Sequence, residues 1–473
     1  MSQSNFRFVS SSRGGKLLVI DNHIFRRKKT INDTEYYYCV KSNCKSSATL
    51  QNSLLIRSSP HSHEPDTGEL IRYEHKNEAK KLIKDSEYPK LCQVYDEVTD
   101  KILNDGRFSK NEAASSVQPF GSVRATLNRA RQERFGALPA SRAGIVVPDS
   151  LKCNSSGQIF LRYQDEGEDK ILLFVTDAFL KLLVESEHVY GDGTFKSVPK
   201  LFQSLYTLHV MKNGMMIPIV YALLPNATTQ TYIAMLRIIQ DLCFNCGLTW
   251  NPKKFTTDFE IATINAIKAV FPSCEIKSCL FHFCQSIWRN TVKHNLAERY
   301  QCSDDDPVKV AIKRISALPF LKVEDVSPTF DSILAQSPTD ENFLAFVNYF
   351  RRNYINDNAR FPIDTWNHFN SRDPRTNNHL EGWHFALNRS VGRYHANLWF
   401  YIEKLVKQQN NFEINLLMAS FGTQVVTQAR KYKINDQKIY NLTQSYIDCE
   451  LSPLEFIDRV RYSTFVSDCI VFS

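Results

Sequence analysis

The sequence predicts a multidomain α+β protein with three parts: a small β-rich unit, a helical middle segment, and an α/β core with a helical insertion. Three observations support this prediction. The chain of 473 residues exceeds the usual size of one domain. Short strand-like runs separated by turns occupy its first 65 residues, and strands alternate with helices beyond residue 185. A hydrophobic content of 43% with only 16 glycines is typical of chains that bury large cores.

The first part, residues 1–67, is expected to consist of short strands. Residues 16–20 and 24–29 flank a turn that contains Asn22, and asparagine tolerates the left-handed backbone that such turns require. Residues 35–40, with three consecutive tyrosines, are a third strand candidate.

The second part, residues 68–150, is expected to be helical. Helices are predicted at residues 70–84 and 90–104, and Ser109 with Glu112 has the spacing of a capping box. A further helix at residues 122–134 places Val123, Leu127 and Ala130 on one stripe and Arg124 and Arg131 on another. This helix is either a DNA-reading element or an ordinary amphipathic helix of a small bundle. Two prolines and several small polar residues mark residues 139–155 as the boundary.

The third part, residues 151–400, is expected to be a mixed sheet with helices on its faces. Residues 203–211 and 216–223 are joined by Lys212-Asn213-Gly214, which is a hairpin signal. Residues 300–375 are mostly helical and form the insertion, and residues 401–473 form a helical tail. The other predicted elements are strands at 188–195, 254–258 and 275–280, and helices at 231–246, 260–270 and 282–295.

Composition excludes several classes of protein. No apolar run reaches the roughly 18 residues that span a bilayer, so no membrane association is expected. The start of the chain lacks the pattern of a secretory signal, and the 12 cysteines are therefore expected to be thiols or metal ligands. Residues 1–65 contain ten Lys or Arg and four Asp or Glu, so most of the net charge of +8 lies there. The run Arg26-Arg27-Lys28-Lys29 is either a phosphate-binding surface or a solvated face.

Four candidate metal ligands lie inside this basic part, within a span of 25 residues. Cys39 and Cys44 are followed, after sixteen residues, by His61 and His63. Two thiolates and two imidazoles meet the tetrahedral preference of zinc. A strand-rich unit of this size has marginal stability without a bound metal, so the pattern predicts a structural zinc site.

This N-terminal part resembles the FLYWCH zinc-finger family. Asn22 stands where that family usually has glycine, and Tyr37 stands where it has tryptophan, so a turn residue and an aromatic residue are retained. The residues that carry the resemblance, in the family's order, are Phe8, Ser12-Arg13-Gly14, Leu18, Phe25, Tyr37, Cys39, Cys44, His61 and His63.

Three acidic residues stand at the ends or beginnings of predicted elements in the core. Asp192 and Asp258 each lie at a strand end, and Glu381 opens a helix. Carboxylates brought together at one sheet edge can hold two divalent cations, which activate an attacking oxygen and stabilise the leaving one in phosphoryl transfer. Each acid alone is also compatible with an ordinary turn position.

The order and context of these acids resemble the DDE transposases of the Mutator-like element (MULE) class. The resemblance covers roughly residues 185–400. It is carried by Asp192-Gly-Thr-Phe, Thr257-Asp258-Phe-Glu260, Cys279-Leu-Phe-His282 and Asn378-His379-Leu-Glu381-Gly-Trp383. The resemblance implies a ribonuclease-H-like core in which Asp192, Asp258 and Glu381 bind catalytic magnesium or manganese.

Other residues leave two interpretations open. Cys279 and His282 are either a buried thiol and an imidazole adjacent to the active site or part of a second zinc site. Trp288 and Trp383 are expected in the core, as are Cys243 and Cys246 on an apolar helix.

The sequence therefore predicts a nuclear, DNA-binding transposase or transposase-derived protein that cleaves and transfers DNA strands with a DDE triad. Zinc in the finger and magnesium or manganese at the triad are the expected cofactors. DNA-contacting residues are expected at Arg26, Arg27, Lys28, Lys29, Arg124 and Arg131. The alternative is a catalytically silent zinc-finger regulator, and a third option is a core that serves homo-oligomer assembly on DNA.

Overall fold

The computed structural model describes residues 6–11, 15–86, 88–369, 371, 378–422 and 430–463, and it describes the side chains of all of these except 378, 379, 381, 430–433 and 463. The chain divides into two compact units, Met1–Leu138 and Pro139–Ser473. Strands of the described residues form one sheet in each unit. No helix in this part of the chain combines the length and apolarity needed to cross a membrane.

The first unit opens with a six-stranded antiparallel meander in which each strand pairs with the next along the chain. Its strands are β1 (Phe6–Ser10), β2 (Lys16–Ile20), β3 (His23–Ile31), β4 (Thr34–Cys39), β5 (Ser47–Gln51) and β6 (Leu54–Ser58). The turn between β2 and β3 has left-handed backbone at Asp21 (φ 47°) and Asn22 (φ 62°), which confirms the predicted hairpin.

Four helices follow the meander: α1 (Thr67–Asp85), α2 (Leu91–Asn104), α3 (Lys110–Ser116) and α4 (Phe120–Phe135). At the start of α3 the Ser109 side chain accepts from the Glu112 amide, and Glu112 accepts from the Ser109 amide, so the predicted capping box is confirmed. Helix α4 buries Val123, Leu127 and Ala130 as its sequence pattern predicts.

Meander and helices share one hydrophobic core. Val19 and Ile24 of the sheet belong to the same buried cluster as Leu70 of α1 and Leu127 of α4. The buried Glu74 carboxylate of α1 reinforces this junction. It forms ion pairs with Arg7 of β1 at 2.9 Å and with Arg107 at 2.9 Å, so a carboxylate removed from water has charged partners on two sides.

The second unit is built on a seven-stranded sheet in the order β13-β12-β9-β10-β11-β8-β7. Strands β9, β10 and β11 are antiparallel neighbours, whereas β12 is parallel to β9 and β13 is parallel to β12. The strands are β7 (Leu161–Gln164), β8 (Leu172–Phe174), β9 (His188–Thr194), β10 (Ser204–Lys212), β11 (Met215–Leu224), β12 (Lys254–Thr257) and β13 (Glu275–Ser278).

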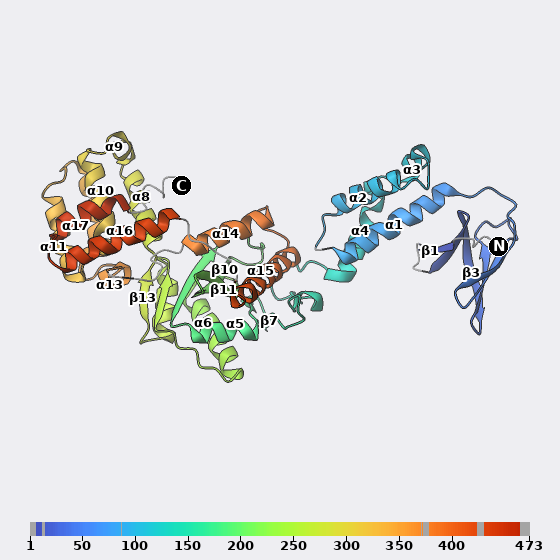
Figure 1. Ribbon diagram of the computed structural model, residues 1–473, viewed down its shortest axis with the longest axis horizontal. Coiled ribbons are helices and arrows are strands. Elements are labelled where there is room, and N and C mark those ends of the chain that lie inside the picture. Colours follow the sequence, from blue (N-terminus) through green and yellow to red (C-terminus); the bar gives the residue numbers. More distant parts are fainter. Residues whose placement is uncertain are drawn as a thin grey trace. The chain divides into compact units, whose positions relative to one another are not determined.

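Helices cover both faces of this sheet (Figure 1). Along β10, Tyr206 packs on Tyr232 of α6 with ring centroids 5.1 Å apart, whereas His209 packs on Trp383 of α14 at 5.4 Å. Odd and even positions of one strand thus face different helices, as the alternation of strand side chains requires. The covering helices are α5 (Asp177–Glu185), α6 (Thr229–Asn245), α7 (Ile261–Val270), α8 (Leu280–Lys293), α14 (Asn378–Val391) and α15 (Leu398–Ser420).

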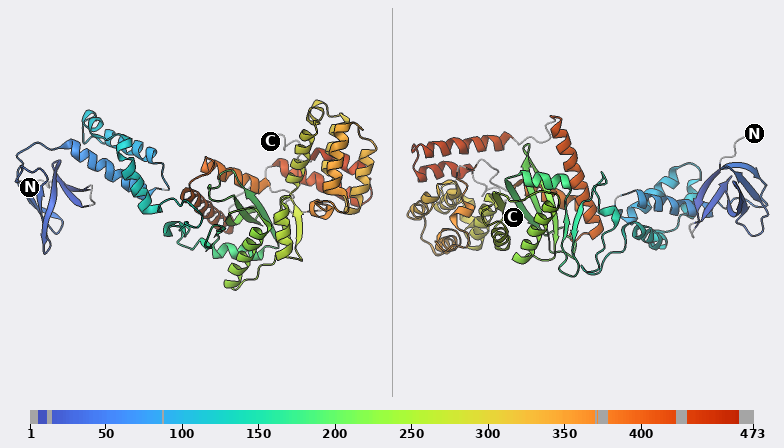
Figure 2. Two further views of the ribbon diagram at one scale, coloured as in Figure 1. Left: turned by 180° about the vertical axis from the view of Figure 1, so that it is seen from behind. Right: turned by 90° about the horizontal axis from the view of Figure 1, so that it is seen from below.

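The helical insertion between α8 and α14 packs together with the C-terminal helices, as both views in Figure 2 show. Arg314 of α10 donates to both carboxylate oxygens of Asp458 of α17 at 2.8 and 2.7 Å. The insertion comprises α9 (Ala297–Cys302), α10 (Pro307–Ala317), α11 (Val323–Leu334), α12 (Glu341–Phe350), the π-helical turn η3 (Arg351–Ile355) and α13 (Ile363–Trp366). The C-terminal helices are α16 (Arg430–Ile447) and α17 (Pro453–Val460), and short 3-10 turns are η1 (Asp149–Leu151), η2 (Leu318–Phe320) and η4 (Arg461–Ser463).

Candidate functional sites

The four Cys and His residues singled out in the sequence come together in the first unit. Cys39 ends β4, Cys44 lies in the turn before β5, and His61 and His63 lie in the segment between β6 and α1. One ligand atom from each of the four lies within 4.8 Å of the others. This separation is what tetrahedral coordination of one zinc ion by two sulfurs and two nitrogens requires.

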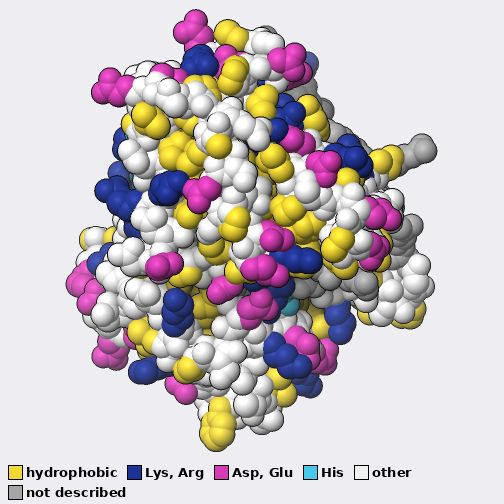
Figure 3. All heavy atoms as spheres, turned by 90° about the vertical axis from the view of Figure 1, so that its left-hand side faces the viewer, with side chains coloured by type: hydrophobic (Ala, Val, Ile, Leu, Met, Phe, Trp, Pro, Cys, Tyr) yellow, Lys and Arg dark blue, Asp and Glu magenta, His cyan; other side chains and the backbone are white. Residues whose placement is uncertain are grey.

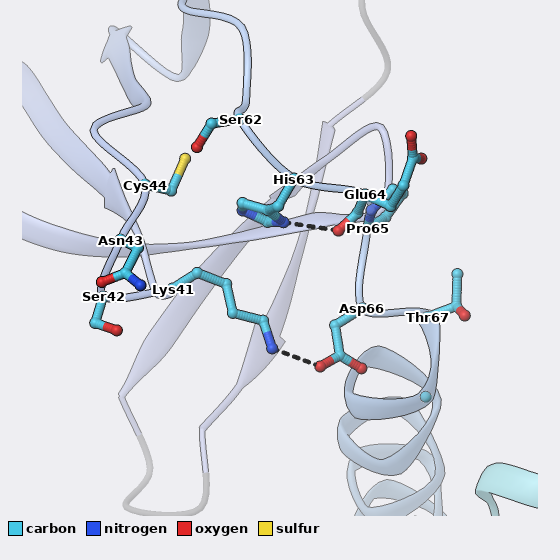
Figure 4. Close-up of a pocket in the computed structure, with 11 residues that line it drawn as sticks. Lys41, Ser42, Asn43, Cys44, Ser62, His63, Glu64, Pro65, Asp66 and Thr67 are labelled. Carbon is cyan, nitrogen blue, oxygen red and sulfur yellow. Dashed lines mark hydrogen bonds and ion pairs between the residues drawn. The ribbon is translucent and has the colours of Figure 1, made fainter.

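The nitrogens that face the sulfurs are defined by the hydrogen bonds of the two rings. His63 Nε2 lies 3.3 Å from Cys39 Sγ, while its Nδ1 lies 2.7 Å from the Glu64 carbonyl oxygen and donates to it (Figure 4). His61 Nδ1 lies 3.5 Å from Cys44 Sγ. An imidazole whose second nitrogen is fixed by a carbonyl presents the first one to a metal, so the set fits zinc.

The electrostatics of the cluster favour the forms that bind a metal. Burial, with repulsion from His23 and His63, lowers the pKa of His61 to about 4, which keeps its ring neutral. The backbone amide of Ser62 lowers the pKa of Cys44 to about 7, although burial raises the pKa of Cys39. The ring of His23 stacks on His61 with centroids 3.6 Å apart and planes 4° from parallel. No spacing pattern in the sequence indicates this stacking partner.

The basic run of β3 is exposed, and its four side chains have different surroundings. Arg27 forms an ion pair with Glu35 at 2.8 Å on the face that carries Tyr37. A bulge between Arg27 and Lys29 shifts the register, and the Lys29 ammonium lies over the Tyr36 ring at 5.4 Å. Lys28 is the extra residue of the bulge.

The two arginines predicted on α4 also differ. Arg124 is exposed. Arg131 is half-buried, donates to Asn128 Oδ1 at 2.8 Å and lies over the Tyr88 ring at 4.8 Å. Arg131 thus takes part in packing within the helical bundle.

Asp192 and Asp258 of the second unit stand side by side at the same edge of the sheet. Tyr190 of β9 pairs with Thr256 of β12 in parallel register. Each aspartate lies two residues beyond that pair, and neighbouring strands are about 4.8 Å apart. Burial, with repulsion from Asp192 and Glu260, raises the pKa of Asp258 to about 7. Burial is the larger cause of this rise in the pKa, and the neighbouring carboxylates add to it.

Asp192 is buried and held from two directions. Its Oδ2 lies 3.1 Å from His384 Nδ1 on α14, and its Oδ1 accepts from the Gly193 amide at 2.9 Å. Burial alone would raise the pKa of Asp192, but His384 offsets this and the pKa lies below its usual range. His384 Nε2 in turn lies 3.2 Å from Thr207 Oγ1, which lies 2.9 Å from Nε2 of the buried His209.

Glu260 is a further acid of this edge that sequence reasoning did not assign. Its carboxylate accepts from the hydroxyls of Tyr232 at 2.9 Å and Thr263 at 3.0 Å. Burial raises its pKa, and Asp192 adds to that effect. Glu260 stands two residues after Asp258 in the quoted motif, and this proximity could have indicated it as a site residue. His384 stands three residues after Glu381 and could have been found in the same way.

The structure places Cys279 and His282 at the start of α8. Cys279 is fully buried, whereas His282 lines a cavity together with Asp258 and Glu260. Trp288 and Trp383 are buried, as predicted. The side chain of Glu381 lies outside the described residues. Among the described ones, the acidic edge does not gather three ligand atoms within 4.8 Å as the Cys/His cluster does.

The glycine before Asp192 has a steric reason. A Cβ atom at Gly191 would lie 2.3 Å from the Tyr206 hydroxyl and 2.8 Å from the Phe255 ring. Gly191 therefore lets β9 approach both aromatic side chains, and this contact fixes the backbone from which the Asp192 carboxylate extends.

Comparison with known families agrees with both sites. Residues 8–63 match the FLYWCH zinc finger domain, and residues 188–286 match the MULE transposase domain. The chain contains a FLYWCH zinc finger and a MULE transposase domain. The FLYWCH match includes all four zinc-ligand candidates, and the MULE match includes Asp192, Asp258, Cys279 and His282 but ends before Glu381. A search of curated proteins finds no match.

Proposed function

We propose that this DNA-binding, transposase-related protein acts in the nucleus and cleaves DNA with divalent metals held by Asp192, Asp258 and Glu381. The observation that supports the proposal is that Asp192 and Asp258 each lie two residues beyond the Tyr190–Thr256 pair of adjacent parallel strands. Two neighbouring ionisable acids away from bulk water are costly unless a cation joins them. The MULE match over this segment points to the same chemistry.

The topology supports a ribonuclease-H-like core. An antiparallel β9-β10-β11 meander is extended past β9 by the parallel strands β12 and β13. Helix α6 connects the meander to β12, and α7 connects β12 to β13. This places the end of β9 and the end of β12 together, where ligands of open α/β sheets bind.

The acids fit magnesium or manganese, because both ions prefer carboxylate oxygens. When bound, such ions supply charge stabilisation to the attacking and leaving oxygens of a phosphodiester. The protein's own contribution is positional: His384 holds Asp192 Oδ2, and the Gly193 amide holds Oδ1. Glu381 precedes His384 by three residues within the bounds of α14, a spacing that supports its inclusion in the proposed set of acids.

The finger unit supplies the DNA attachment in this proposal. Its excess of Lys and Arg lies in residues 1–65, and Arg26, Lys28 and Lys29 are exposed. Contacts to phosphates by such residues give sequence-independent affinity that falls with salt. Structural zinc keeps the strands that carry these side chains in register.

The test is plasmid nicking by the full chain with Mg²⁺ or Mn²⁺. The Asp192→Asn variant is expected to lose nicking and keep its DNA affinity. Asp241→Asn, an exposed aspartate of α6, is the matched control and is expected to nick normally. Nicking that survives in Asp192→Asn would refute the catalytic role. A wild-type chain that binds DNA but never cleaves it would favour the catalytically silent regulator.

A further inference from the structure

A cavity of about 460 Å³ opens beside the acidic edge and joins it to the helical insertion. Asp258, Glu260 and His282 belong to its lining. The next turns of α8 contribute Gln285, Ser286, Arg289 and Asn290; the insertion contributes Tyr349, Asn353, Tyr354, Arg360 and Phe361; and Phe195 and Phe259 complete the lining. The insertion thus forms part of the wall around the proposed metal site.

Aromatic rings form the apolar wall of this cavity. Phe361 lies 4.8 Å from Phe259 and 5.7 Å from Tyr354, measured between ring centroids. The Ser286 hydroxyl lies 2.9 Å from the Tyr354 hydroxyl and so fixes that ring. Phe195, two residues beyond Gly193, is 49% exposed although it is a large apolar side chain. An exposed ring at the edge of a cavity is available to stack on a planar ligand.

Two arginines also line the cavity. Arg289 and Arg360 are both exposed, and Arg360 lies over the Phe361 ring at 5.4 Å. Among the described residues neither arginine forms an ion pair with a carboxylate. Guanidinium groups in this state bind phosphate oxygens through two parallel hydrogen bonds. The face of the second unit drawn in Figure 3 shows Lys and Arg interspersed with Asp and Glu, without a broad surface of one sign.

The π-helical turn η3 brings insertion side chains into this wall. Arg351–Ile355 continues α12 with wider hydrogen bonding, and Tyr354 and Asn353 of this turn face the cavity while Arg352 does not line it. Such turns are frequent at functional sites because the extra residue re-aims neighbouring side chains. Gln285 adds an amide group that can pair with the edge of a base, whereas Asn290 and Asn353 donate from Nδ2 to the carbonyls of Ser286 and Tyr349 at 2.9 and 2.8 Å.

We infer that this cavity binds one nucleotide of the DNA strand next to the phosphodiester that is cut. The base lies against the aromatic wall with Phe195, and a flanking phosphate contacts Arg289 and Arg360. This inference rests on the proposed function, since the acids of the same lining define where cleavage takes place. It adds a role for the insertion, which would hold the substrate strand.

The experiment titrates the full chain into 2-aminopurine deoxyriboside 5′-monophosphate, whose fluorescence is quenched when the base stacks on aromatic rings. Quenching is expected with the wild type. Arg289→Ala and Arg360→Ala are each expected to weaken binding about tenfold, the loss typical of a charge-assisted hydrogen bond. Phe195→Ala is expected to reduce the quenching. Arg352→Ala, an exposed arginine of η3 outside the cavity, is the matched control.

Three results would overturn the inference. The first is no quenching at millimolar protein and nucleotide, and the second is equal weakening of binding by Arg352→Ala. The third is competition by inorganic phosphate together with no effect of Phe195→Ala, because that combination indicates a simple anion site. The nucleotide measurement requires no cleavage. If it fails while plasmid nicking still depends on Asp192, the cavity assignment is wrong and the metal site stands. If nicking fails while the nucleotide binds through Arg289 and Arg360, the cavity assignment stands and the metal site is wrong.

Discussion

Replacing Asp258 by asparagine is expected to stabilise the metal-free second unit above pH 7. The pKa of Asp258 is raised from 3.8 to about 7 by burial and by the neighbouring carboxylates of Asp192 and Glu260. The native state therefore binds a proton that the unfolded state releases near pH 4. The free energy of unfolding then falls as the pH rises from about 4 to about 7, and the full loss is present above pH 7.

The magnitude follows from the size of the shift. Roughly three pKa units at about 1.4 kcal/mol each give an upper bound of about 4 kcal/mol. A unit as large as Pro139–Ser473 has an unfolding entropy of about 0.7 kcal/mol/K, so the melting temperature at pH 8 should rise by up to roughly 6 °C. At pH 4 the native aspartate is neutral and the unfolded one is about half ionised, so little of the difference is left and the variant should melt within about 1 °C of the wild type.

The assay is differential scanning calorimetry between pH 4 and 8.5 in buffers free of magnesium and manganese. A chelator is avoided because it would remove zinc from the finger. Asp241→Asn serves as the control for removal of an exposed aspartate. Added Mg²⁺ should stabilise the wild type more than the Asp258→Asn variant, because the variant lacks a ligand. An unchanged melting temperature at pH 8, or an equal rise at pH 4, would show that burial and the neighbouring carboxylates do not raise the pKa of Asp258 as described.

Three further outcomes are expected. Cys39→Ser should abolish zinc retention, measured by atomic absorption. It should also unfold the meander, measured by circular dichroism, while the melting of the second unit is unchanged. Retained zinc would contradict the ligand set. Gly191→Ala should destabilise the second unit by about 1–3 kcal/mol through contact with Tyr206, whereas Gly193→Ala, whose nearest neighbour would lie 3.5 Å away, should cost less in the same denaturant titration. His384→Ala should reduce metal-dependent nicking at unchanged DNA affinity, and full activity would exclude a positioning role for His384.

Much of the fold was predictable because local patterns determine it. The hairpin at Asn22, the capping box at Ser109 and the stripe of α4 all depend on residues within one or two turns of one another. The clustering of the zinc ligands was predictable for the same reason. One turn supplies Cys39 and Cys44, and one short segment supplies His61 and His63. The mixed α/β character and the elements of residues 188–293 agree with the structure to within a few residues.

Long-range contacts were not predictable from such patterns. The contact between His384 and Asp192 joins residues on different elements and depends on how α14 lies across the sheet. The ion pair that ties Arg27 to Glu35 also required the register of β3 with β4, and the packing of Arg131 on Tyr88 required the arrangement of the bundle. Strands β7 and β8 and helix α5 were missed because their runs are short.

The packing of α17 on the insertion has a consequence for incomplete synthesis. Phe456, Ile457 and Val460 are fully buried in the same core as Ile312 and Phe330, which precede them by more than a hundred residues. A chain that lacked α17 would therefore expose an apolar surface on α10 and α11. Such products are the usual targets of chaperones and proteases.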